Sequence, residues 1–311
     1  MMDMTQMESS VVMVGPYAVV TGTQNDDFLH PPKARGFIDG LGGADTVNYS
    51  PYADPLMITP SSVGDLVVNV NDQQKDLLRN IERVIGGSAD DRMTGTSANE
   101  VFFGGPGRDI LDGGAGFDGA EYSDKDKSVE VDLSVKGPVV VKVGGQHEDT
   151  LHNIEAVIGG LAGDTLKAAA GRSMLAGGKG DDTLIANGGD DILMGGKGAD
   201  TFVFKSVSDS PFNDPSRIID FNSDDGDRID LSAIDAHAAQ DGFQALAFSG
   251  QNSAAHSVWY SVGADYGDWY APPAIRVDVT GDAVEDMMIL VETGSDVPFH
   301  ITAAALGLVA E

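Results

Sequence analysis

The sequence predicts an all-β protein, a parallel solenoid of very short strands with a β-rich cap at its C-terminal end. Two observations predict it: a nine-residue repeat, in which a glycine-rich turn alternates with one large apolar residue, and the presence of 40 glycines among 311 residues. Glycine makes up roughly 7% of an average protein, and glycines in excess stand at turns that need a positive φ. Each repeat therefore predicts a tight turn followed by a strand with one inward side chain.

The repeat has the form G-G-x-G-x-D-x-u-x, where u is a large apolar residue. Complete copies stand at Gly104–Asp112, Gly177–Ile185 and Gly195–Val203, and Gly113–Glu121 keeps the head but has Ala120 at the apolar place. Weaker copies in the same frame give units that start at residues 22, 31, 40, 86, 95, 104, 113, 159, 168, 177, 186 and 195. The sixth position is acidic in ten of these twelve units and the eighth is apolar in all of them. Such regularity indicates a repeat architecture.

A longer repeat lies on top of the short one. Asn80-Ile81-Glu82 recurs as Asn153-Ile154-Glu155, and Gly104–Asp109 recurs at the same offset as Gly177–Asp182. Residues 40–112 and 113–185 therefore read as a gapless internal duplication, which suits a stack that grows by whole coils.

The acidic positions predict calcium sites. Because alternate turns lie on opposite sides of a flattened coil, units n and n+2 stack on one side, and their carboxylates and turn carbonyls form an all-oxygen cage suited to Ca²⁺. Stacked carboxylates would otherwise repel each other. The expected pairs are Asp27/Asp45, Asp91/Asp109, Glu100/Asp118, Asp164/Asp182, Asp182/Asp200 and, more weakly, Ser173/Asp191. The glycines expected to take part are Gly105, Gly107, Gly114, Gly116, Gly178, Gly180, Gly196 and Gly198. The alternative is a set of ordinary solvated turns without metal.

Other segments give weaker signals. Asp278, Thr280, Asp282 and Asp286 alternate as calcium ligands do, although the glycine usual at the sixth place is Ala283; the alternative is a polar hairpin before a strand at Met287–Val291. The stretches 49–85 and 122–158 lack glycine heads and predict extra β-coils or a protruding loop without calcium.

The composition excludes several classes of protein. A formal net charge of −30 opposes binding to nucleic acid and to anionic membranes, and the absence of cysteine excludes disulfides and thiolate chemistry. No basic residue precedes Lys33, so we expect no cleaved N-terminal signal peptide. Val11–Val20 is too short to form a transmembrane segment, and we expect residues 1–21 to form a tail.

The complete repeats resemble those of the RTX (repeats-in-toxin, hemolysin-type) calcium-binding family over about residues 22–203. Gly198–Phe204, Ile219–Phe221 and Asp227–Ser232 resemble the C-terminal region of serralysin-type secreted metalloproteases. The resemblance implies a parallel β-roll, or β-helix solenoid, with several Ca²⁺ ions between its coils, and a β-rich region at 204–311. It also implies an extracellular protein exported by type I secretion machinery that reads the C-terminus. The last residues, Leu306–Glu311, depart from the serralysin pattern, in which an acidic residue precedes the apolar ones.

No catalytic motif accompanies the repeats. The sequence contains no H-E-x-x-H, G-x-S-x-G or P-loop motif. The sequence therefore favours a secreted, non-catalytic protein that folds on binding extracellular Ca²⁺. Two alternatives stay open: a module, fragment or paralogue of a secreted enzyme, such as a serralysin-type protease or an alginate-modifying enzyme, and a surface or matrix adhesion protein. The sequence does not identify a target ligand.

Overall fold

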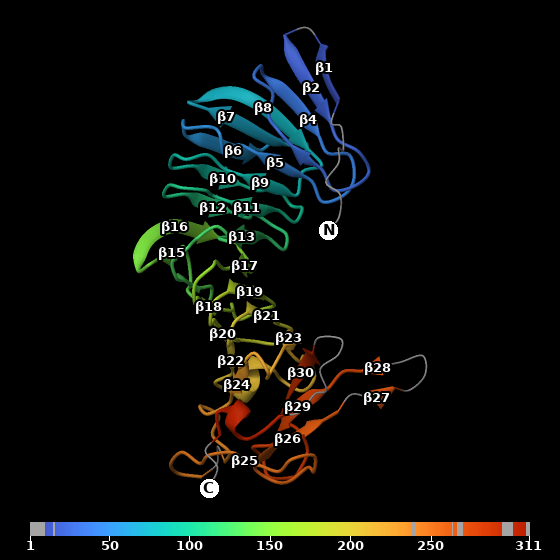
Figure 1. Cartoon of the computed structure of the whole chain (residues 1–311), viewed down its shortest axis with the longest axis vertical. Helices are drawn as coiled ribbons and strands as arrows, with labels where there is room; N and C mark the ends of the chain where they lie inside the picture. Colours follow the sequence, from blue (N-terminus) through green and yellow to red (C-terminus); the bar gives the residue numbers. More distant parts are fainter. Residues whose placement is uncertain are drawn as a thin grey trace. The chain divides into compact units, whose positions relative to one another are not determined.

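The computed structural model describes residues 10–14, 16–237, 240–262, 264–265, 270–293 and 301–308. The chain forms two compact units (Figure 1). Unit 1 consists of residues 1–121, 137–142 and 146–156, and unit 2 of residues 122–136, 143–145 and 157–311.

Unit 1 contains two sheets of mostly parallel strands. The order of the first sheet is β1 (Ser10–Val14), β2 (Tyr17–Thr21), β4 (Gly36–Asp39), β8 (Gln73–Arg79), β7 (Leu66–Val70), β6 (Leu56–Pro60), β10 (Arg92–Thr94), β12 (Ile110–Asp112), β16 (Gln146–His152) and β15 (Val139–Val143). The order of the second sheet is β3 (Phe28–Leu29), β5 (Thr46–Asn48), β9 (Arg83–Ile85), β11 (Val101–Phe103) and β13 (Gly119–Glu121).

Unit 2 continues the same pattern and ends in antiparallel strands. Its first sheet has the order β14 (Val129–Asp132), β18 (Thr165–Lys167), β20 (Thr183–Ile185), β22 (Thr201–Val203) and β24 (Arg228–Asp230). The second has the order β17 (Ala156–Ile158), β19 (Met174–Lys179), β21 (Ile192–Lys197), β23 (Arg217–Phe221), β30 (Met287–Thr293), β29 (Ala274–Val277), β26 (Ser257–Ser261) and β25 (Ala247–Phe248). The remaining elements are the 3₁₀ helices η1 (Val207–Asp209) and η2 (Ala304–Leu306) and the hairpin of β27 (Ala264–Asp265) with β28 (Tyr270–Ala271).

The register of the strands confirms the predicted parallel roll. In unit 1, Met93 of β10 lies opposite Leu111 of β12, and in unit 2, Leu166 of β18 lies opposite Leu184 of β20. In each pair the two residues hold the same place in repeats that stand two apart in the sequence, so two nonapeptides complete one coil. Antiparallel pairing of β26, β29 and β30 makes the C-terminal part of unit 2 β-rich, as expected.

The eighth residue of each repeat lies in the core. All twelve are at most 1% exposed: Leu29, Ile38, Val47, Met93, Phe102, Leu111, Ala120, Leu166, Leu175, Leu184, Leu193 and Phe202. Each nonapeptide thus contributes one inward apolar side chain at its eighth place, and the stack of coils buries these side chains as a continuous column within each unit.

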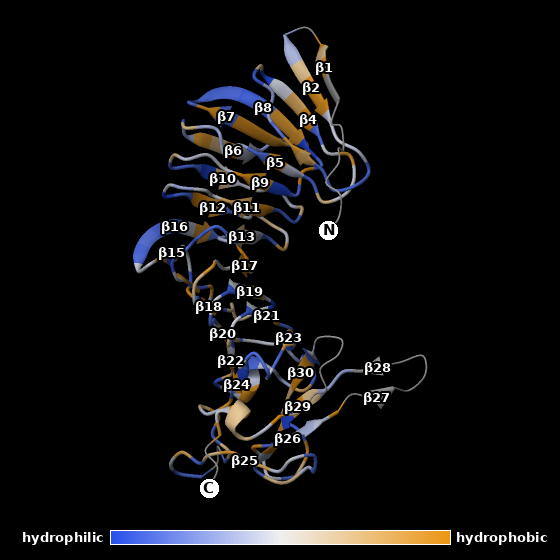
Figure 2. Ribbon diagram, viewed as in Figure 1, coloured by the Kyte–Doolittle hydropathy of each residue, from blue (hydrophilic) through white to orange (hydrophobic). Residues whose placement is uncertain are grey.

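The first stretch without glycine heads forms additional strands. β6, β7 and β8 pair antiparallel to one another, and β8 returns to lie parallel to β4, with Leu77 opposite Phe37. β6 and β7 are mostly apolar, whereas the start of β8 is hydrophilic (Figure 2). The expected extra β structure is therefore an antiparallel meander inserted into the parallel sheet. The strands of the second such stretch are divided between the two units.

The N-terminal segment differs from the tail that the sequence suggested. Of residues 1–21, those from Ser10 onward form the antiparallel pair β1 and β2, apart from Gly15, which lies outside the described residues, and Pro16. β2 pairs parallel with β4, and its Ala18 and Val20 are buried. The alternation of apolar residues in this strand explains the pairing, because it gives β2 one face that covers the end of the core.

Candidate calcium-binding turns

The sixth-position carboxylates are buried at the turns. All ten are at most 5% exposed: Asp27, Asp45, Asp91, Glu100, Asp109, Asp118, Asp164, Asp182, Asp191 and Asp200. Burial of an ionised carboxylate is costly unless hydrogen bonds or a cation compensate it.

Each predicted same-side pair is in direct contact through the backbone. Asp182 Oδ1 accepts the Asp164 N–H at 2.7 Å, and Asp200 Oδ1 accepts the Asp182 N–H at 2.9 Å. The same bond joins Asp27 to Asp45, Asp91 to Asp109, Glu100 to Asp118 and Ser173 to Asp191. The sequence predicted two carboxylates that face each other. In the structure one oxygen of the later carboxylate instead accepts the N–H of the earlier turn. In Asp191 the second oxygen also accepts an N–H, from Asn187.

The turns are of two kinds. In the closed turns, which start at residues 22, 86, 95, 159, 168 and 186, the N–H of the second residue donates to the side chain of the sixth, as Gly87 does to Asp91 Oδ2 at 2.7 Å. In the open turns, which start at 40, 104, 113, 177 and 195, the second residue has a positive φ instead: Leu41, Gly105, Gly114, Gly178 and Gly196. Four of the five open turns stack on the closed turn two repeats before them, and the last stacks on the open turn at 177.

The open turns contain buried oxygens that lack a donor. Among the described residues, Oδ2 of Asp45, Asp118, Asp182 and Asp200 is buried and accepts no hydrogen bond. An unsatisfied buried carboxylate oxygen costs the full desolvation penalty of the group. A cation beside these oxygens would remove that cost, so the residues fit a bound Ca²⁺.

The pKa values of the buried carboxyl groups are raised, as expected for acids that have no cation beside them. Burial raises the pKa of Asp182 to about 8, and the carboxylates of Asp164 and Asp200 contribute to the rise. Burial likewise raises the pKa of Asp191 to about 7 and that of Asp45, Asp118 and Asp200 to about 6. Burial thus makes these acids keep their protons to a higher pH, whereas a bound divalent cation would favour the ionised carboxylates.

Backbone carbonyls line the same gaps. A Cβ on Gly178 would lie 2.6 Å from the Gly160 carbonyl oxygen, and one on Gly107 would lie 2.6 Å from that of Ala89. All eight glycines predicted to take part have a positive φ, from 94° to 151°: Gly105, Gly107, Gly114, Gly116, Gly178, Gly180, Gly196 and Gly198. The carbonyls of the second and fourth residues of one turn therefore lie against the glycines of the next, which is an oxygen-rich setting typical of Ca²⁺ ligation.

Four acidic residues extend these contacts beyond the nonapeptides. The N–H groups of Asp45 and Asp118 donate to Glu82 and Glu155, and those of Asp109 and Asp200 donate to Asp149 and Asp227. Sequence reasoning assigned none of the four to the site. The internal duplication was the signal that could have found the first pair, because it aligns Glu82 with Glu155.

The loop at 278–286 is closed by its own hydrogen bonds. It joins β29 and β30 as a hairpin, and Asp278 accepts the N–H groups of Gly281 and Ala283, both at 2.7 Å. Asp286 Oδ2 accepts those of Val279 and Thr280. Burial alone would raise the pKa of Asp278, but these donors outweigh it and lower the pKa. Two of the four predicted ligands therefore already accept backbone N–H groups. These two are Asp278 and Asp286, and the other two are Thr280 and Asp282.

Two further observations concern the described residues. No group of three or more histidine, cysteine, aspartate or glutamate side chains in them is arranged to hold a metal ion. Sites made of one or two carboxylates and several carbonyls would not form such a group. None of the helices described is long and apolar enough to cross a membrane.

Comparison with known families identifies two regions. Residues 85–120 match the model described as RTX calcium-binding nonapeptide repeat (4 copies), and residues 146–298 match that described as peptidase M10 serralysin C terminal. The second match begins before residue 204 and so includes the repeats of unit 2. Neither model describes a catalytic domain.

Comparison with solved structures gives low overall superposition. The AlgE6R3 subunit of the mannuronan C5-epimerase from Azotobacter vinelandii is 22% identical, with a TM-score of 0.21, over 66% of this chain and 71% of that one. The extracellular lipase LipA from Serratia marcescens is 15% identical, with a TM-score of 0.26, over 89% of this chain and 45% of the lipase. The chain thus spans less than half the length of that lipase. The comparison with curated proteins gives no match.

Proposed function

We propose that this chain, which carries RTX calcium-binding nonapeptide repeats and a serralysin-type C-terminal region, is a secreted, non-catalytic protein that folds around extracellular Ca²⁺. The observation that carries the proposal is the set of buried, donor-free oxygens on Asp45, Asp118, Asp182 and Asp200. Each lies in an open turn, and a cation is the partner that such an oxygen lacks.

The residues that would hold each ion come from two turns on one side of a coil. For the turn at 177, Asp182 supplies its free Oδ2, and Gly160 and Ala162 of the preceding turn on that side supply carbonyl oxygens. The ion would supply positive charge that keeps the carboxylate ionised. The chain itself orients the ligands, because Asp182 Oδ1 is already fixed by the Asp164 N–H.

The domain organisation that we propose has three parts: residues 1–21, a calcium-binding roll at 22–203, and a C-terminal region at 204–311 that carries the signal for type I export. Support comes from the two matched families, whose domains are typical of extracellular proteins secreted by that route. The last three residues of the segment Leu306–Glu311 lie outside the described residues.

Counting bound calcium tests the proposal. We expect at least four Ca²⁺ per chain, since four open turns each present a free oxygen. Equilibrium dialysis with metal analysis, or calorimetry of the chelator-treated chain, gives the number. A count of one or none would overturn the proposal.

A second candidate function is that of a calcium-binding module of a secreted enzyme. The description of the family matched at 146–298, a peptidase C-terminal region, favours this candidate. Incubating the calcium-loaded chain with casein and with alginate tests whether the chain itself is catalytic. Turnover of either substrate would show that the chain is catalytic, and no turnover is what we expect of the non-catalytic protein.

A further inference from the structure

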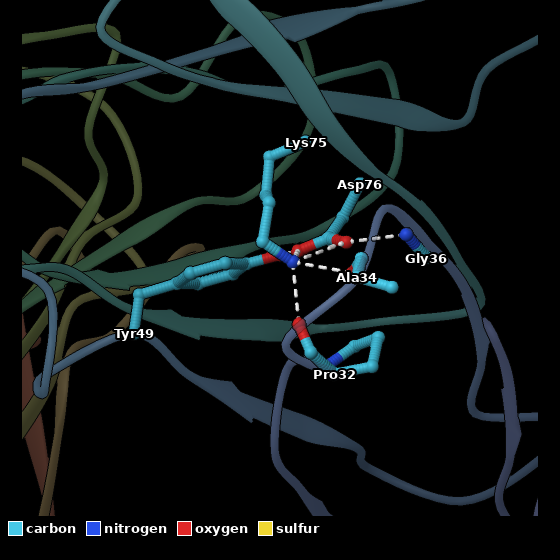
Figure 3. A network of polar contacts seen from close by, with 6 residues as sticks. All are labelled: Pro32, Ala34, Gly36, Tyr49, Lys75 and Asp76. Carbon is cyan, nitrogen blue, oxygen red and sulfur yellow. Dashed lines mark hydrogen bonds and ion pairs between the residues drawn. The ribbon is translucent and has the colours of Figure 1, made fainter. Parts of the chain in front are cut away.

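A lysine ammonium lies inside one coil of unit 1, among backbone oxygens. Lys75 Nζ donates to the carbonyls of Pro32 at 2.5 Å and Ala34 at 2.7 Å, and it lies 3.2 Å from Asp76 Oδ1 (Figure 3). The Lys75 side chain is 15% exposed and that of Asp76 is 0% exposed. The carboxylate is therefore buried, and the lysine is half-buried beside it.

The partners of this ammonium occupy the positions of calcium ligands. Pro32 and Ala34 are the second and fourth residues of the nonapeptide unit that starts at 31. Asp76 Oδ1 accepts the N–H of Gly36, the sixth residue of that unit, at 2.8 Å. The candidate calcium turns have the same three parts: carbonyls of the second and fourth residues, and a carboxylate that accepts the sixth N–H.

The coil that contains Lys75 satisfies its carboxylate without a metal. Asp76 Oδ2 accepts the Tyr49 hydroxyl at 2.9 Å, and Lys75 supplies the positive charge (Figure 3). The unit at 31 also has no acidic sixth residue, since Gly36 stands there. In four of the open turns, by contrast, Oδ2 of Asp45, Asp118, Asp182 or Asp200 accepts no hydrogen bond.

The duplication places an equivalent site in the second copy, without the lysine. Pro32, Ala34 and Gly36 correspond to Gly105, Gly107 and Asp109, while Lys75 and Asp76 correspond to Glu148 and Asp149. The defining bond recurs, because Asp149 Oδ1 accepts the Asp109 N–H at 2.8 Å. The carboxylate is again buried, at 1% exposed. An acidic side chain thus stands where the first site has its lysine.

We propose that the Lys75 ammonium substitutes for a calcium ion in the first copy, and that the equivalent position in the second copy binds Ca²⁺ through Asp149 and the carbonyls of Gly105 and Gly107. This inference rests on the proposed calcium-binding function and adds a site that uses a ligand outside the nonapeptides. Unit 1 would then contain one coil whose cation is the lysine side chain and other coils that must bind a calcium ion from solution.

Calcium counts on matched variants test the inference. Lys75→Ala removes the ammonium and should increase bound Ca²⁺ by one per chain, while Asp149→Asn should decrease it by one. Lys33→Ala is the control, because it removes an exposed lysine of the same coil and should leave the count unchanged. Hydrogen exchange at Phe37 and Ile38 of β4 should also show that the β4–β8 pair depends more on calcium in Lys75→Ala than in the wild type.

The outcomes separate this inference from the proposed function. A wild type that binds no calcium would refute the function. A wild type that binds several ions, with the same number in folded Lys75→Ala and Asp149→Asn, would refute only this inference. If Lys75→Ala fails to fold even in about 10 mM Ca²⁺, the count for Asp149→Asn decides: one ion fewer supports the site, and an unchanged number overturns it.

Discussion

Asp182 takes part in two neighbouring turns at once. Its Oδ1 accepts the N–H of Asp164, and its own N–H donates to Asp200 Oδ1. Its Oδ2 is among the buried oxygens without a donor. Asp27 differs, because its Oδ2 already accepts the N–H and the hydroxyl of Thr23.

Asp182→Asn should therefore weaken calcium binding more than Asp27→Asn does. The amide keeps an acceptor for the Asp164 N–H but loses the charge that a cation requires. We expect the calcium midpoint for folding to rise, because each tenfold weakening of the site that contains Asp182 removes about 1.4 kcal/mol of the stabilisation that calcium supplies. A calcium titration followed by circular dichroism measures the midpoint. Asp126→Asn removes an exposed carboxylate and serves as the control; equal shifts in all three variants would mean that only net charge matters.

The raised pKa values predict that a higher pH lowers the stability of the metal-free fold but raises its affinity for calcium. Asp182 has a pKa of about 8 in the fold, against an ordinary value of 3.8. The metal-free fold thus holds protons that the unfolded chain releases, so its stability should fall as pH rises from about 4 to about 8. Calcium displaces those protons, so calcium affinity should rise over the same range.

Circular dichroism of the residual fold in chelator at pH 5 and pH 8, and calorimetry of calcium binding in buffers of different ionisation enthalpy, measure both effects. Asp182→Asn should release fewer protons on binding calcium than the wild type. An affinity that is unchanged between pH 6 and pH 9 would contradict the assignment of the buried acids as ligands.

At the scale of the strand and turn, the glycines of the open turns have a steric role that is separable from metal binding. Gly178 has a φ of 104°, and a Cβ there would lie 2.6 Å from the Gly160 carbonyl oxygen. Gly171 stands in a closed turn nearby, and a Cβ there would have no neighbour within 4 Å. The two positions form a natural pair for comparison.

Gly178→Ala should destabilise the calcium-loaded chain by about 1–3 kcal/mol, because alanine at a positive φ is strained and the carbonyl must move. Gly171→Ala should be neutral or stabilise by about 0.4–1 kcal/mol through the unfolded state. Urea unfolding at saturating calcium gives both values. Similar effects at the two positions would show that the turns are looser than the structure implies.

The elements differ in how well the sequence predicts them. The apolar residue at the eighth place and the glycines at positive φ were predictable, because each nonapeptide uses them in the same way. The antiparallel meander of β6, β7 and β8 was not, because its pairing depends on contacts with β4 and β10, which lie far away in sequence.

Single side chains were the hardest to predict. Glu82 and Asp149 lie outside the nonapeptide frame, and Lys75 has no sequence signal that separates it from a surface lysine. Their roles follow from the backbone groups that the fold brings to them. The sequence also did not predict that each backbone N–H donates directly to a carboxylate, since a pattern of acidic positions does not show which atoms come into contact.

At the scale of the whole molecule, calcium should decide whether the chain folds. A net charge of −30 and buried carboxylates oppose the compact state in the absence of a cation. Extracellular calcium modules bind with dissociation constants near 10⁻⁴–10⁻³ M, and about ten times that concentration stabilises by about 1.4 kcal/mol per site. Five sites would contribute about 7 kcal/mol, comparable with the stability of many domains.

Circular dichroism and thermal melting in chelator and in about 10 mM Ca²⁺ test this. We expect a β spectrum and a cooperative transition with calcium, and a largely unfolded spectrum without it. Mg²⁺ at the same concentration is the control, because its smaller octahedral sphere suits carbonyl-rich cages poorly. Identical spectra and transitions in chelator and calcium would show that the turns need no metal.

The hydrogen bonds between successive turns all point the same way along the solenoid, and this favours one order of folding for the coils. The N–H of Asp164 is held by Asp182, that of Asp182 by Asp200, and that of Asp200 by Asp227. Each coil therefore receives its stabilising acceptor from the coil that follows it in the chain. Growth toward the N-terminus always adds a turn to a finished template, whereas growth toward the C-terminus leaves the newest turn incomplete. If the chain leaves a narrow channel with its C-terminal end first, the C-terminal coils would fold first and each later coil would form on them. Each folded coil would then be too wide to slide back into the channel.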